Sequence, residues 1–194
     1  MVFLRLSSCN LRCPFCDTDF SSYHEMTTSE IIAALREQSA DCNRVCITGG
    51  EPSLQVDEAL VCAFKEAGYK IHIETNGTRK LPDGIDWITL SPKEDFIGPR
   101  GHVVLQKADE LKLVYTGFND PSKWAGFPAF YHFLQPCDPG EICLADGGKN
   151  AASQDREDEA FLLTTDTTSA TLRYALSHPQ WRVSLQIHKI LGIS

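Results

Sequence analysis

The sequence lacks the features that would place the protein in a membrane, on a nucleic acid or outside the cell. No apolar run approaches the roughly 20 residues that a membrane-spanning helix needs. The 18 Lys and Arg residues are outnumbered by 26 Asp and Glu, and the net charge of −8 argues against direct nucleic-acid binding. The opening segment, residues 1–6, has too few apolar residues for a signal peptide. We therefore expect a cytoplasmic protein that acts on a small molecule.

The chain also lacks internal repeats and the length that two large domains would need. With 194 residues and 42% hydrophobic side chains, residues 1–194 are expected to form one domain with a sizeable core. The polar stretch 138–158 has no usable periodicity and is rich in Gly, Asp, Ser and Lys. We predict that it is a mobile insertion in this domain.

Short apolar and β-branched runs that are typical of strands recur along the chain. They lie at residues 2–4, 44–48, 70–74, 87–90, 111–115, 130–135 and 182–186. Helical patterns lie between several of them, at 29–36 after the capping pair Thr27 and Glu30, at 57–67 and at 159–177. Alternating strands and helices indicate a parallel α/β sheet. The predicted fold class is α/β, an incomplete TIM-like barrel of about six parallel strands with few helices.

Eight cysteines are an even number, but without secretion a disulfide framework is not expected. Cys9, Cys13 and Cys16 form a C-x3-C-x2-C run with no fourth ligand nearby. An iron–sulfur cluster held by three cysteines keeps one iron open to an outside ligand, whereas carrier clusters and structural zinc normally have four protein ligands. The spacing therefore predicts chemistry at a cluster. Cys46 and Cys62, in apolar surroundings, are predicted to be small buried hydrophobes.

Ligands in parallel α/β folds gather at the carboxyl ends of the strands, and unusual residues follow four of the predicted strands. These segments are the cysteine loop, Gly49-Gly50-Glu51-Pro52, residues 74–78 and Ser91-Pro92-Lys93. The glycines expose backbone groups to a ligand, and Glu51 can receive an ammonium group. Gly-Gly and Ser-Pro are also ordinary turn sequences, so a purely structural role stays open for each turn. We expect the four turns to converge on one edge of the sheet.

The cysteine loop, with Phe15 before its last cysteine, resembles the radical S-adenosylmethionine (SAM) superfamily. Nearly the whole chain resembles one of its families, 7-carboxy-7-deazaguanine synthase, at residues 9–20, 47–52, 74–78, 91–93, 109–112 and 186–189. The most specific element is Cys16-Asp17-Thr18-Asp19, because a hard oxygen ligand directly after a cluster cysteine is unusual in the superfamily. Relatives begin with a longer segment that includes a Gln-Gly-Glu-Gly loop for substrate binding. Either the start lies upstream, or part of the pocket is missing here.

The resemblance implies a set of site residues. Cys9, Cys13 and Cys16 would hold a [4Fe–4S] cluster, and Thr18 would bind Mg²⁺. Contacts to SAM would come from Phe15, Asp17, Gly50, Ser91, Pro92 and Lys93, and contacts to the substrate from Arg5, Thr48 and Ser194. Arg5 also has a physical argument, since a guanidinium buried in an apolar strand needs an anion such as a substrate carboxylate. An arginine that faces outward on a strand edge fits the same pattern.

The implied activity is that of a radical SAM carbon–nitrogen lyase of 7-deazapurine (queuosine-type) biosynthesis. It would convert 6-carboxy-5,6,7,8-tetrahydropterin to 7-carboxy-7-deazaguanine with loss of ammonia, as a homodimer supplied by an electron donor such as flavodoxin or ferredoxin. Two alternatives stay open from the residues. A radical-generating activase of a glycyl-radical enzyme shares the cysteine loop but has no reason for Cys16-Asp-Thr-Asp. A zinc-binding interaction module would use Cys9, Cys13, Cys16 and His24.

Overall fold

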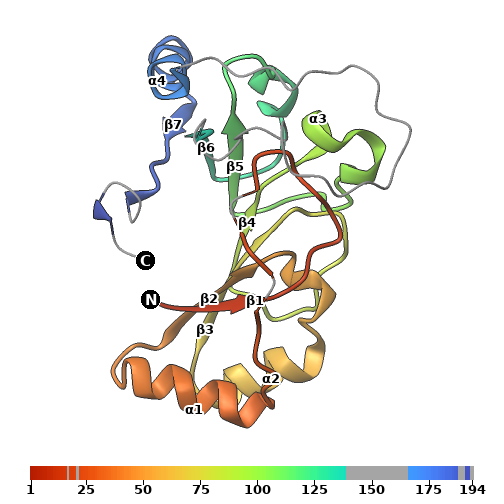
Figure 1. Cartoon of the computed structure of the whole chain (residues 1–194), viewed down its shortest axis with the longest axis vertical. Coiled ribbons are helices and arrows are strands. Elements are labelled where there is room, and N and C mark those ends of the chain that lie inside the picture. The colour runs from red at the N-terminus through yellow and green to blue at the C-terminus, as the bar shows by residue number, and fades with distance from the viewer. Residues whose placement is uncertain (17, 21, 139–165, 188–190, 193–194) are drawn as a thin grey trace.

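Seven parallel strands form one sheet in the computed structural model, which describes residues 1–16, 18–20, 22–138, 166–187 and 191–192. The strands are β1 (Val2–Leu6), β2 (Arg44–Gly49), β3 (Lys70–Thr75), β4 (Trp87–Leu90), β5 (Glu110–Tyr115), β6 (Tyr131–Pro136) and β7 (Trp181–Val183). They lie in the order of the sequence, β1 to β7 (Figure 1). The predicted parallel α/β sheet with few helices is confirmed, with seven strands instead of six. The predicted insertion lies, apart from Asp138, outside the described residues.

The helices are α1 (Thr28–Gln38), α2 (Glu58–Glu66), α3 (Glu94–Ile97) and α4 (Thr167–Ser177), with 3₁₀ turns η1 (Pro52–Leu54), η2 (Gly98–Gly101) and η3 (Pro121–Trp124). The predicted capping box begins α1, because the Thr27 hydroxyl accepts from the N–H of Glu30 and the Glu30 carboxylate accepts from the N–H of Thr27. The short helix α3 was not predicted, since four residues carry too little periodicity. Among the described helices, none is long and apolar enough to span a bilayer.

Successive side chains of each strand point to opposite faces of the sheet, so that one face is apolar and the other is polar. On the apolar face, one cluster packs β1–β3 against α1 and α2, and a second packs β4–β7 against α4. Fully buried members include Ile47, Ile71, Phe64, Leu111 and Leu134. Burying a side chain of this size contributes about 1.5–3 kcal/mol. The strand residues between these core positions form the polar face, which we define as Thr48, His72, Glu74, Thr89, Glu110 and Lys112.

Strand register places the polar-face side chains in rows across neighbouring strands. Glu74 of β3 pairs with Thr89 of β4, and Thr89 pairs with Glu110 of β5. Arg5 of β1 pairs in the same way with Thr48 of β2. Because a parallel sheet keeps this alignment from strand to strand, polar residues that are distant in sequence become neighbours on one surface.

Two expectations about burial were wrong. Cys62 is exposed on α2, because its neighbours Val61 and Phe64 take the side of the helix that packs on the sheet. Arg5 is exposed, because it lies with Phe3 on the side of β1 opposite the buried Val2. Cys46 is buried, as predicted.

Candidate active site

Hydrogen bonds tie together the turns that follow β1 to β4. The N–H of Gly50 donates to the carbonyl of Leu6 (3.0 Å), and the N–H of Glu51 donates to the carbonyl of Ser8 (2.9 Å). On the other side of the same edge, the N–H of Ser91 donates to the carbonyl of Thr75 (2.8 Å). The prediction that these turns converge on one edge of the sheet is confirmed.

The two glycines after β2 lie directly on the backbone of the cysteine loop. A Cβ on Gly49 would lie 1.9 Å from the carbonyl oxygen of Leu6, and one on Gly50 would lie 1.9 Å from that of Ser8. Ser8 itself has a left-handed backbone (φ 81°), a conformation that costs about 1–3 kcal/mol and that persists only where the surrounding structure compensates for this cost. The sequence suggested ligand contact for these glycines, and the structure adds a second reason for them, the close approach of two chain segments.

Glu51 is a buried carboxylate, 1% exposed, between the glycine turn and the turn after β3. Its Oε1 accepts from the N–H of Ser53 (3.0 Å) and the hydroxyl of Thr75 (2.6 Å), and its Oε2 accepts from the N–H of Asn76 (2.7 Å). A buried charge is stable only with such partners. Glu51 therefore fastens the end of β2 to the end of β3, a role that the sequence did not reveal.

Asn10, next to Cys9, connects the cysteine loop to the turn after β3. Its side-chain oxygen accepts from Nδ2 of Asn76 (3.0 Å), and its Nδ2 donates to the hydroxyl of Thr78 (2.8 Å). Together with the bonds from Gly50 and Glu51, these contacts hold the first part of the loop from two neighbouring strands.

The three cysteines of the loop are free thiols that share one electrostatic neighbourhood. Burial raises the pKa of Cys9 and raises the pKa of Cys13 to about 11, and the charge of each of the other thiols adds to the effect on Cys13. The positive charge of Lys93 acts in the opposite direction and lowers the pKa of Cys13. Because metals bind the thiolate form, cluster assembly at this loop must release protons.

A cluster with three cysteine ligands fits this loop. Within the described ranges, no three side chains of His, Cys, Asp or Glu are grouped closely enough to hold a single metal ion. In a cubane cluster each cysteine ligand binds a different iron, so the thiolates need not meet at one point. The donor set agrees with this requirement, since the thiols are unbridged and softer than the oxygen ligands that hard cations prefer.

The residues predicted to contact SAM lie around the same loop. Phe15 packs edge to face against Phe96 of α3, with ring centroids 4.7 Å apart. Lys93, after β4, donates from Nζ to the carbonyl (2.8 Å) and the hydroxyl (2.5 Å) of Ser91. Burial lowers the pKa of Lys93, and the charge of Cys13 acts in the opposite direction and raises it. Pro92 between them is buried.

Some predicted site residues cannot be placed in this way. Asp17 and Ser194 lie outside the described residues. Thr18 is half-buried in the segment after Cys16, and His24 is exposed. Their roles as SAM, substrate, magnesium or zinc contacts stay predictions.

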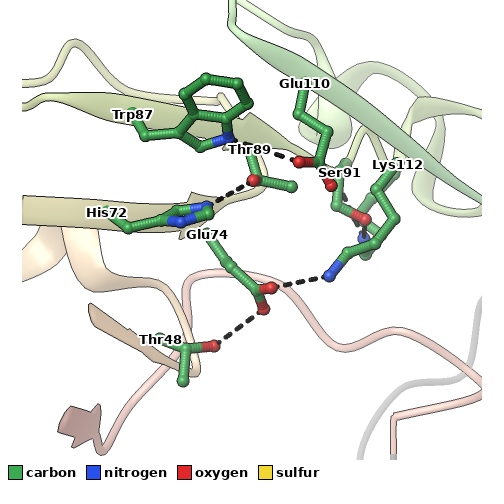
Figure 2. Close-up of polar contacts among 9 residues, drawn as sticks. Thr48, His72, Glu74, Trp87, Thr89, Ser91, Glu110 and Lys112 are labelled. Atoms are coloured by element: carbon green, nitrogen blue, oxygen red, sulfur yellow. Dashed lines mark hydrogen bonds and ion pairs between the residues drawn. The ribbon is translucent and has the colours of Figure 1, made fainter. Parts of the chain in front are cut away.

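Thr48, a predicted substrate contact, belongs to a hydrogen-bond network on the polar face (Figure 2). Its hydroxyl donates to Oε2 of Glu74 (3.3 Å), and Nζ of Lys112 donates to Oε1 of Glu74 (2.7 Å). Burial alone would raise the pKa of Glu74, but the charge of Lys112 and the two hydrogen bonds hold it below its usual range. Glu74 is therefore an ionised carboxylate at neutral pH.

A second set of contacts joins the row of Glu74, Thr89 and Glu110 to the row before it, which His72 and Trp87 occupy. The His72 ring and the Thr89 hydroxyl share a hydrogen bond (2.8 Å), and the Trp87 indole donates to Glu110 (3.3 Å). Burial lowers the pKa of His72 and raises that of Glu110, so it favours the neutral form of both. The alternation of charged and apolar residues in 70–75 and 110–113 is the signal that could have revealed this face.

Comparison with known proteins places this edge of the sheet in a wider context. The sequence profile of the radical SAM superfamily matches residues 5–94, which include the cysteine loop, the glycine turn and Ser91-Pro92-Lys93. The chain is 40% identical over 192 residues to a 7-carboxy-7-deazaguanine synthase of Bacteroides thetaiotaomicron, covering 99% of this chain and 87% of the relative. A protein of the same name from Bradyrhizobium diazoefficiens is 37% identical over 214 residues, covering 99% and 89%.

Two solved structures are similar in fold. QueE from Escherichia coli has a TM-score of 0.63 and 22% identity, covering 95% of this chain and 84% of that chain. SuiB from Streptococcus suis has a TM-score of 0.58 and 15% identity, covering 95% and 48%. At these identities the likeness shows a shared fold.

Proposed function

We propose, because the chain belongs to the 7-carboxy-7-deazaguanine synthase family of the radical SAM superfamily, that it converts 6-carboxy-5,6,7,8-tetrahydropterin to 7-carboxy-7-deazaguanine with loss of ammonia. The observation that carries this proposal is a sequence identity of 40% that extends over 99% of the chain. Neither a glycyl-radical activase nor a zinc-binding module accounts for similarity of that extent.

The cofactors of the family are a [4Fe–4S] cluster and SAM, and together they supply a carbon radical for hydrogen abstraction when an electron arrives. In the proposed assignment Cys9, Cys13 and Cys16 hold the cluster. The backbone of Gly50 lies next to their loop and binds the amino acid end of SAM. Glu51 keeps this turn in place, because it bonds to β3 beneath it.

The polar face orients the pterin in this proposal. A pterin ring carries adjacent N–H donors, and an ionised carboxylate such as Glu74 accepts hydrogen bonds from them. Thr48 lies beside Glu74. A hydrogen bond to a charged group contributes about 1.5–3 kcal/mol. The exposed guanidinium of Arg5, paired in register with Thr48, is available for the substrate carboxylate.

The activity is tested directly by an anaerobic assay with reconstituted protein, SAM, dithionite, Mg²⁺ and the carboxypterin. We expect 5′-deoxyadenosine, ammonia and the deazaguanine product. SAM cleavage without any deazaguanine, also from a version extended upstream to include the Gln-Gly-Glu-Gly loop of relatives, would reject the substrate. A glycyl radical on an added partner protein would favour the activase instead.

Magnesium enters the proposal through Thr18, whose hydroxyl would bind the ion so that it steers the rearrangement of the substrate. Thr18→Ala is expected to lower product formation about tenfold or more, equivalent to about 1.4 kcal/mol of barrier. Iron content and SAM cleavage without substrate are expected to stay unchanged. Thr18→Ser, which keeps the hydroxyl, is the matched control. Equal loss of iron and product in Thr18→Ala would contradict a magnesium role.

The proposed setting is a cytoplasmic homodimer that receives its electron from a small redox protein such as flavodoxin or ferredoxin. The support is the family membership and, for the compartment, the several free cysteines of the described chain, which a reducing environment preserves. Light scattering after size-exclusion chromatography tests the homodimer. Replacing dithionite with a flavodoxin and its reductase tests the donor.

A further inference from the structure

Lys112 of β5 is a largely buried cation on the polar face of the sheet. Leu111 and Leu113 on either side of it are fully buried in the apolar face, so alternation sends Lys112 to the polar face. Its side chain is only 19% exposed. An ammonium group withdrawn from water in this way needs a partner of opposite charge. That partner is Glu74 of β3, two strands away, whose Oε1 lies 2.7 Å from Nζ of Lys112.

The two oxygens of Glu74 are engaged to different degrees. Oε1 accepts the short, charge-assisted bond from Lys112, whereas Oε2 has a 3.3 Å bond from the Thr48 hydroxyl (Figure 2). Each carboxylate oxygen can accept two hydrogen bonds. Because the Glu74 side chain is 33% exposed, a ligand on the polar face can reach this carboxylate.

Building on the proposed function, we propose that Lys112 is a positioning residue that acts through Glu74. It fixes Oε1 and keeps the carboxylate charged, so that Oε2 is presented in one orientation to the N–H donors of the pterin. Lys112 itself need not touch the substrate.

Among the charged and titratable groups around Glu74, Lys112 is the one that keeps the carboxylate charged. These groups are Cys46 on β2, His72 on β3, Glu110 and Lys112 on β5, and Arg5 on β1, which is exposed to solvent beside Thr48. His72 is kept neutral by burial, and Glu110 bonds to Trp87 and adds no positive charge. If Lys112 is neutralised, burial acts to protonate Glu74.

A double-mutant cycle tests the proposal in the reconstituted enzyme. Lys112→Met is expected to raise KM for the carboxypterin about tenfold. Lys112→Arg is expected to restore most of the loss, since arginine also pairs with a carboxylate. In a Glu74→Gln background, Lys112→Met is expected to change KM less than about twofold. Lys107→Met, at an exposed position before β5, is the control for loss of a lysine.

A pH series adds a readout that a merely structural role would not move. In Lys112→Met the pKa of Glu74 rises, so KM is expected to increase as the pH falls from about 8 to 6, whereas wild-type KM stays flat. Lys112→Gln, which keeps a donor but removes the charge, is expected to show the same pH dependence and replaces Lys112→Met if that variant does not fold.

Several outcomes would overturn the proposal. Lys112→Met with wild-type KM, or with an equal KM effect in the presence and absence of Glu74, would show that Lys112 does not act through the carboxylate. Failure of Lys112→Arg to rescue would point to a size requirement instead. If wild-type enzyme makes no deazaguanine, the proposed function fails and the assignment of Lys112 falls with it. An active wild type with additive variants rejects the Lys112 assignment alone.

Discussion

Cys13→Ala is expected to abolish SAM cleavage, with a loss of at least about 1,000-fold, or about 4 kcal/mol of barrier. The variant leaves two cysteines where the cluster needs three, and the polypeptide offers no replacement in the C-x3-C-x2-C run. Iron analysis after anaerobic reconstitution and chromatographic detection of 5′-deoxyadenosine measure the effect. We expect iron far below four atoms per chain in the variant.

Cys62→Ala is the matched control for this experiment. Cys62 is also a free thiol, but it is exposed on α2, on the side away from the sheet. We expect full iron content and wild-type SAM cleavage. Normal SAM cleavage by Cys13→Ala would contradict the cluster assignment, and so would stoichiometric zinc with no uptake of iron by the wild type.

Glu51→Ala is expected to lower the free energy of unfolding by about 3–5 kcal/mol. The substitution removes a buried carboxylate and leaves three donors without an acceptor, on Ser53, Thr75 and Asn76. It also frees the glycine turn from β3, so the cysteine loop that rests on this turn loses support. Equilibrium unfolding in urea measures the loss, and iron content reports the loop.

Glu51→Gln separates shape from charge. The amide has nearly the volume of the carboxylate but offers one accepting oxygen instead of two, so at least one backbone N–H faces an NH2 group. Its expected effect lies between those of wild type and Glu51→Ala. Glu37→Ala, at an exposed position on α1, is expected to change the unfolding free energy by no more than about 0.5 kcal/mol. A similarly small change in Glu51→Ala would mean that the buried contacts of Glu51 do not hold the two turns together.

The strands and the long helices could be predicted because their signals are local. Apolar runs between turn residues marked β1 to β7, and the Thr27–Glu30 capping box marked the start of α1. The convergence of the turns followed from the parallel order, since carboxyl ends of parallel strands lie at one edge. Cys9 to Cys16 and Gly50 could be placed at this edge for the same reason.

Other features depend on which segments meet, and a single sequence does not contain that information in local form. The burial of Arg5 was predicted wrongly because the apolar run 2–6 does not show which side of β1 faces the core. The hydrogen bonds of Glu51 connect residues 24 and 25 positions apart. The Lys112–Glu74 pair spans 38 positions and two strands, and the alternating pattern around each partner could have revealed a polar face but not this pairing.

The close packing of the glycine turn on the cysteine loop has a consequence for the order of assembly. The backbone bonds from Gly50 and Glu51 to residues 6 and 8 are made by the polypeptide alone. The conformational entropy of residues 6–8 is therefore lost when the sheet folds. Cys9, which follows this stretch directly, is accordingly attached to a backbone whose course the fold of β1 and β2 has already set.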